Sequence, residues 1–62
     1  MNTELVAYSI DAFCRAHDIS RAMFYKLARQ GIGPRTMRVG TRQLISAEAA
    51  ADWRLHQQAI AA

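Results

Sequence analysis

The sequence predicts a mainly α-helical domain with a small β-hairpin, and three observations support this fold class. Two short amphipathic segments near the N-terminus each follow a serine, and a four-residue connection separates them. A stretch containing glycine and proline comes next and leads into two short segments joined by a Gly-Thr pair. A third segment is rich in alanine and other strong helix formers. The patterns predict three helices and a two-stranded hairpin in one domain covering residues 1–62.

The first helix is expected over residues 10–17. Ser9 is a favourable N-cap, and Asp11 lies in the first turn, where a negative charge suits the helix dipole. Residues 1–8 form a lead-in that is either a strand-like segment packed on the core or a frayed terminus. Apolar or aromatic residues recur at i, i+3, i+4 and i+7 and define the inner stripe of the helix, which comprises Ile10, Phe13, Cys14 and His17.

The second helix is expected over about residues 20–30, with Ser20 as its N-cap and Gly31 just past its end. Asp18 fits the preceding turn because aspartate tolerates left-handed backbone. At ~100° per residue, an apolar face and a basic face lie on opposite sides of this helix. The apolar face comprises Ser20, Phe24, Leu27 and Ala28, and the opposite face comprises Ala22, Lys26, Arg29 and Gln30.

The hairpin is expected over about residues 36–45, around the two-residue turn Gly40-Thr41. Glycine at the first turn position suits a type II′ turn. Because a two-stranded hairpin is marginally stable alone, its apolar residues Met37 and Val39 are expected to dock on the helices.

The third helix is expected over residues 47–58 after the N-cap Ser46, and residues 59–62 form a tail that could fray. Trp53 is the largest apolar residue of the chain, and we expect it to be the centre of the small core.

The basic residues are distributed unevenly. The chain has a net charge of +3, but the segment from Ile19 to Ala47 holds six basic residues and no acidic one. The remainder holds two basic and five acidic residues. A concentrated positive segment of this kind is typical of a nucleic-acid-binding surface. The six residues are Arg21, Lys26, Arg29, Arg35, Arg38 and Arg42.

Other function classes are disfavoured. A domain of 62 residues has little room for a water-excluding pocket, and no nucleophile–base set or metal cluster is visible. We therefore expect no enzyme activity, cofactor, metal site or small-molecule ligand. Cys14 is expected to be a buried small hydrophobe. No segment resembles a signal peptide or a transmembrane helix, so we expect a cytoplasmic protein with no membrane partner.

The order of these landmarks resembles the excisionase/AlpA-like family of small DNA-binding proteins. The resemblance covers roughly residues 8–53 and includes every landmark in turn. Two positions depart from the family pattern: Asp18 replaces a usual glycine, and Thr41 stands where the hairpin often carries another arginine. The segments that carry it are Ile19-Ser20-Arg21, Phe24-Tyr25-Lys26-Leu27, Gly31, Gly33-Pro34-Arg35, Arg38-Val39-Gly40-Thr41-Arg42, Leu44-Ile45-Ser46 and Glu48-Ala49 to Trp53.

The resemblance implies a winged helix-turn-helix domain, related to the DNA-binding part of MerR regulators, that binds double-stranded DNA. The second helix would be the recognition helix and the hairpin the wing. Such proteins act in bacteria or phages, as transcription regulators of mobile elements or as directionality factors in excisive DNA recombination. Tyr25 is balanced between a DNA contact and a core position. The expected DNA-binding residues are Ser20, Arg21, Ala22, Tyr25, Lys26, Arg29, Arg35, Arg38, Thr41 and Arg42.

Two further expectations concern partners. A single small module covers only one half-site on DNA, so we expect dimeric or cooperative self-association there. The alternative function is a small protein-interaction module, such as an antitoxin-like or anti-repressor adaptor, whose basic face binds an acidic protein.

Overall fold

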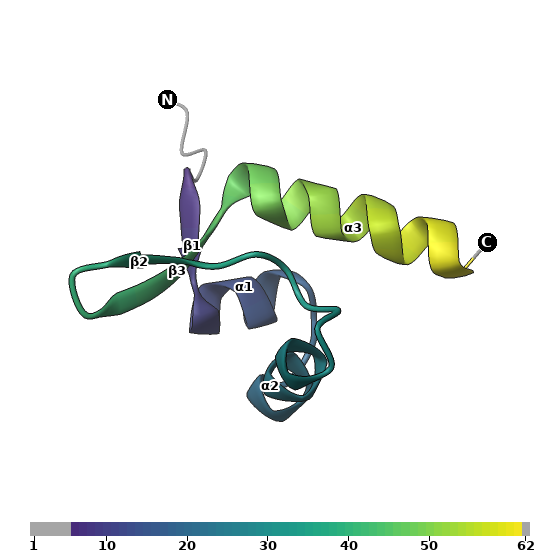
Figure 1. The fold of residues 1–62 in the computed structure, drawn as a ribbon, viewed down its shortest axis with the longest axis horizontal. Helices are drawn as coiled ribbons and strands as arrows, with labels where there is room; N and C mark the ends of the chain where they lie inside the picture. The colour runs from purple at the N-terminus through teal and green to yellow at the C-terminus, as the bar shows by residue number, and fades with distance from the viewer. Residues whose placement is uncertain (1–5, 62) are drawn as a thin grey trace.

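The computed structural model describes residues 6–61 and contains three helices and a three-stranded antiparallel sheet (Figure 1). The predicted combination of three helices with a small β-element is confirmed, although the sheet has one strand more than expected. The last helix also continues past the expected end at residue 58. In chain order the elements are β1 (Ala7–Ser9), α1 (Ile10–Ala16), α2 (Arg21–Arg29), β2 (Met37–Val39), β3 (Arg42–Ser46) and α3 (Ala47–Ala61).

The additional strand is β1, which overlaps the end of the lead-in of residues 1–8 and continues to Ser9. The strand order is β1-β3-β2, and Tyr8 of β1 stands opposite Ile45 of β3. The main-chain N–H of Ala47 also donates to the carbonyl of Val6 at 2.8 Å. The lead-in is thus strand-like where it is described, and residues 1–5 lie outside the described range. The expectation of a two-stranded sheet was wrong, because β3 has a partner along both of its edges.

Each helix begins with a serine cap, as the sequence predicts. In every case the serine hydroxyl oxygen accepts a hydrogen bond from the main-chain N–H three residues later. This bond satisfies one of the donors that a helix start leaves without a partner. The three bonds join Ser9 to Ala12, Ser20 to Met23 and Ser46 to Ala49, each at 3.0 Å.

Helices α1 and α2 end in the same way, on a residue in the left-handed conformation. This residue is Asp18 after α1, with φ of 57°, and Gly31 after α2, with φ of 76°. Two N–H groups then turn back to carbonyls of the last helical turn, which is the Schellman arrangement. The four bonds are Asp18 N–H to Arg15 (3.3 Å), Ile19 N–H to Cys14 (3.0 Å), Gly31 N–H to Ala28 (3.1 Å) and Ile32 N–H to Leu27 (3.0 Å).

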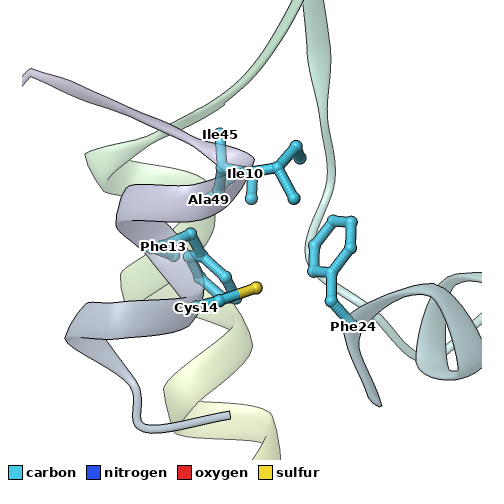
Figure 2. Close-up of a cluster of buried hydrophobic side chains, with 7 residues drawn as sticks. Ile10, Phe13, Cys14, Phe24, Ile45 and Ala49 are labelled. Atoms are coloured by element: carbon cyan, nitrogen blue, oxygen red, sulfur yellow. The ribbon is translucent and has the colours of Figure 1, made fainter. Parts of the chain in front are cut away.

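The core lies where α1, β3 and the start of α3 meet, with one side chain contributed by α2 (Figure 2). Phe13, Phe24 and Ile45 are its largest fully buried side chains. Phe24 is also the only buried residue of α2, so the apolar face predicted for that helix is narrower than expected. Ala28, assigned to that face, is exposed. The buried hydrophobic residues are Ile10, Phe13, Cys14, Phe24, Ile45, Ala49 and Ala50.

Trp53 does not occupy the centre of the core, contrary to expectation. It is half-buried, and its ring meets that of Phe13 edge-on at a centroid distance of 5.4 Å. Its indole Nε1–H donates to the main-chain carbonyl of Ile32 at 2.9 Å. Trp53 therefore fastens the segment that follows α2 onto α3, and the indole N–H obtains the partner that it would lack in the centre.

The hairpin turn agrees with prediction. Val39 and Arg42 are paired across a two-residue loop, and Gly40 has φ of 63°. Thr41 is not among the described residues with positive φ, so the signs of the two turn residues are those of a type II′ turn.

The apolar face of β2 does not dock on the helices, which contradicts the expectation for Met37 and Val39. Both residues are exposed, to 40% and 55% respectively. Met37 is paired with Leu44, and the pleat directs the next residue, Ile45, to the opposite face of the sheet. Because Ile45 enters the core, the alternating apolar residues of β2 lie on the other face. The hairpin is therefore attached to the body through β3, by its pairing with β1 and by the burial of Ile45.

We predict that Asp18→Gly stabilises the protein by about 0.5–1 kcal/mol. A left-handed conformation costs a non-glycine residue about 1–2 kcal/mol, and the greater backbone freedom of glycine in the unfolded chain offsets part of this gain. Urea unfolding measures the difference. Asp18→Ala is the matched control, since it removes the same carboxylate without supplying glycine's conformational freedom. A glycine variant no more stable than the alanine variant would contradict the prediction.

Candidate nucleic-acid interface

The outward side of α2 is fully available to a ligand. Only one residue of the helix is buried, and the helix packs mainly on α1. Met23 is also exposed, which adds an apolar side chain that was not among the expected site residues. The expected site residues on α2 and at its cap, all of them exposed, are Ser20, Arg21, Ala22, Tyr25, Lys26 and Arg29.

The hairpin carries the second group of expected site residues. It extends away from the body of the molecule, and α3 runs away from it on the other side (Figure 1). Arg38, Thr41 and Arg42 are exposed around its tip. Arg38 is paired with Gln43 and Arg42 with Val39, so the two arginines stand on opposite faces of the ribbon. The sequence placed both near the tip but did not indicate that they point apart.

Arg35 lies in the connection between α2 and β2 and contacts the body of the protein. Its Nη2 is 3.3 Å from a carboxylate oxygen of Asp52 in α3. Both side chains remain more than half exposed, so the pair contributes little to stability. Its position nevertheless directs Arg35 toward α3, and Arg35 is therefore a weaker candidate for DNA contact than the other expected cations.

Arg21 has one partner on α1 and one on its own helix, α2. Its Nη1 donates to a carboxylate oxygen of Asp11 in α1, and its guanidinium carbon lies 5.9 Å from the ring centroid of Tyr25. The hydrogen bond and the negative charge of Asp11 raise the pKa of Arg21. Tyr25 is 38% exposed and meets the ring of Phe24 edge-on at 5.2 Å. The Asp11 contact could not be predicted from the sequence, because the two residues belong to different helices.

The other cations of α2 and the hairpin have no acidic partner within residues 6–61. The two ion pairs of residues 6–61 join Arg21 to Asp11 and Arg35 to Asp52. Both acids lie outside the positive segment. Two elements therefore present unneutralised charge to solvent. The exposed residues concerned are Lys26, Arg29, Arg38 and Arg42.

His17 connects the end of α1 to α3 through its two ring nitrogens. Its Nδ1 lies 2.8 Å from the carbonyl of Phe13 and its Nε2 lies 2.9 Å from Nη1 of Arg54. A carbonyl accepts and a guanidinium donates, so these two contacts fit the tautomer that carries a proton on Nδ1. Its ring also stacks on Phe13 at 4.1 Å.

Three further features of the described chain concern metal, membrane and small-molecule binding. Residues 6–61 contain no cluster of three or more potential metal ligands among His, Cys, Asp and Glu. None of the helices there has both the length and the hydrophobicity needed to cross a membrane. An open groove of about 310 Å³ lies between the segment after α2 and α3, with Ile32, Pro34, Trp53 and Ile60 among its lining residues.

Comparison with known proteins provides no family: no family model, no curated protein and no solved structure matches this chain.

We predict that stability falls at alkaline pH through Cys14. Burial raises the pKa of the Cys14 thiol, and the nearby charge of Arg21 lowers it to a smaller extent. The folded state therefore holds this proton more tightly than the unfolded state. The stabilisation is complete below the ordinary thiol pKa of about 8.5 and is lost as the pH rises through the folded-state value. Urea unfolding at several values between about pH 7 and 10 should show this loss.

Cys14→Ala is the control for the alkaline loss. The alanine variant should be less stable at neutral pH, because it leaves a small cavity, but its stability should fall less steeply as the pH rises. Equal slopes for the two proteins would exclude a contribution from the thiol.

Proposed function

We propose that this protein binds double-stranded DNA sequence-specifically as a winged helix-turn-helix domain, in which α2 is the recognition helix and the β2–β3 hairpin is the wing. The observation that carries the proposal is the set of exposed cations on these two elements, which lack acidic partners among the described residues. Phosphate contacts supply a large share of the affinity of such proteins, and they require Lys and Arg side chains that no carboxylate of the protein already neutralises.

The α2 helix has features that suit the major groove. It spans nine residues and exposes nearly all of its side chains, so it can enter the groove without removing a core residue. Residues at the start of a recognition helix reach deepest, which assigns base contact to Arg21. Lys26 is a second choice for base contact, and Arg29 would bind phosphate. Of the first N–H groups, that of Met23 is capped by Ser20; those before it can donate to a phosphate.

The hairpin suits contact with the DNA backbone beside the major groove. Its two-residue turn makes a narrow tip, and the pleat places Arg38 and Arg42 on its two faces. Each groove of the duplex is bounded by two phosphate backbones. A ribbon with one arginine on each face can therefore contact both backbones. Thr41 at the tip adds a hydroxyl donor but no charge.

The biological role is proposed from the resemblance to excisionase/AlpA-like proteins. The protein would act in the cytoplasm of a bacterium as a transcription regulator or an excision factor of a mobile element. A footprint over a promoter would favour regulation. Stimulation of integrase-dependent excision would favour the second role, and absence of both effects would exclude these assignments.

We predict strongly salt-dependent DNA binding. If about five phosphates are neutralised, log K falls with log salt with a slope of about −4 to −5. Gel-shift titrations on random duplex DNA between about 50 and 200 mM salt measure this slope. A flat response, or no binding at low salt, would contradict the proposal and favour a protein partner.

Paired arginine variants test which surface binds. Arg38→Gln combined with Arg42→Gln should weaken binding to all DNA sequences and make the slope shallower by about two, because each lost phosphate contact removes about one unit. Arg15→Gln combined with Arg54→Gln is the matched control, since it removes the same charge from two exposed residues outside the positive segment. An equal change in the control would show that only net charge matters.

We also predict cooperative or dimeric binding. A single small module buries roughly 600–1,000 Å² on DNA, which is little for tight specific binding. Gel-shift titration on DNA with one or two copies of a selected site, combined with sedimentation, measures the stoichiometry. One tightly bound monomer per site, unaffected by a second site, would contradict this prediction.

A further inference from the structure

The side chain assigned to base contact is held by two neighbours before any DNA is present. Arg21 is bonded through Nη1 to Asp11, which projects from the first turn of α1. The guanidinium also lies over the ring of Tyr25, one helical turn further along α2. Two helices therefore fix one exposed and flexible side chain.

We propose that Asp11 is a positioning residue that presents Arg21 to a guanine in the major groove, and that Asp11 thereby sets a guanine preference at one position of the target DNA. This inference rests on the proposed DNA binding and deepens it by naming the base that is selected and the residue that enforces the selection.

The geometry leaves the guanidinium able to bind a base while it is held. Among the described residues, its recorded hydrogen bond uses Nη1, so the edge formed by Nε and Nη2 remains free. That edge carries two parallel N–H donors. Guanine presents two acceptors, O6 and N7, on its major-groove edge, and this is the common bidentate partner of arginine. Arg21 and Asp11 are each 56% exposed as side chains, so a DNA base can approach the pair.

The advantage of holding Arg21 is entropic. An exposed arginine samples many rotamers, and fixing it on a base costs binding free energy. On random DNA the side chain does not need one conformation, so this cost falls mainly on the specific complex. A partner that already restricts Arg21 therefore favours the correct site over the rest of the DNA.

The same carboxylate acts against binding in general. Asp11 is a negative charge close to the surface that would approach the phosphates, and it neutralises part of the charge of Arg21. Asp11 is thus expected to weaken binding to any DNA while increasing discrimination. A residue that only stabilised the fold would affect both properties in the same direction.

Tyr25 has a corresponding part in this arrangement. Its ring meets the buried ring of Phe24 edge-on at 5.2 Å, and the guanidinium carbon of Arg21 lies over it at 5.9 Å from the centroid. The face of the Tyr25 ring therefore attracts the guanidinium through a cation–π contact. Tyr25 would thus act on DNA binding indirectly, by holding Arg21. The sequence had left open whether Tyr25 is a core residue or a DNA contact.

Selection from a randomised duplex pool tests the inference. The wild-type chain should enrich one guanine about ten- to a hundredfold over other bases, and Arg21→Ala should abolish that enrichment. Asp11→Asn should reduce the enrichment about two- to tenfold while binding random DNA more tightly than wild type. Asp11→Glu, which keeps the carboxylate, should retain more of the preference than Asp11→Asn.

Glu48→Gln is the matched control, because Glu48 is an exposed acid in the first turn of α3 and lies on a different helix from Arg21. It should leave the guanine preference unchanged, and circular dichroism should show each variant folded, since the Ser9 cap of α1 does not depend on Asp11. Undiminished guanine preference in Asp11→Asn, or an equal loss in Glu48→Gln, would overturn the inference while DNA binding itself stands. Failure of the wild-type chain to bind any duplex would instead overturn the proposed function.

Discussion

The packing around Phe13 is the interaction on which the fold depends. Its ring is fully buried and lies within 6.1 Å of four other aromatic rings, measured between centroids. These rings belong to β1, α2, α3 and the cap of α1. A seven-residue helix and three-residue strands are too short to persist alone in water, so a shared centre is required. The four neighbours of Phe13 are Tyr8, His17, Phe24 and Trp53.

The sequence predicts most local features of this fold because local chemistry determines them. Serine caps start the three helices, and residues in left-handed backbone end the first two. The Gly40-Thr41 pair sets the hairpin turn. Each of these depends on a few consecutive residues, so composition and spacing suffice to find them. Partners distant in the chain were harder to find: β1 is only three residues long, and its pairing with β3 joins Tyr8 to Ile45.

In the candidate site, too, local features were predictable from the sequence and contacts between elements were not. Exposure of the cations on α2 and the hairpin followed from helical and strand periodicity. The contacts of Arg21 with Asp11 and of Arg35 with Asp52 could not be predicted, because each depends on how two elements pack. Trp53 illustrates the same difficulty in the core. Its size suggested a central position, but an indole N–H needs an acceptor, and the carbonyl of Ile32 provides one at the margin.

The attachment of α2 has a consequence for how such a domain can change. The helix begins at its own serine, ends at its own glycine and inserts a single buried side chain, Phe24, into the core. Its outward residues contribute almost nothing to folding, with Arg21 and its partner as the one link to another helix. The exposed residues of α2 can therefore be substituted, by mutation or by grafting, while the fold is retained. Substitutions across this surface would therefore change its charge and shape at little cost in stability.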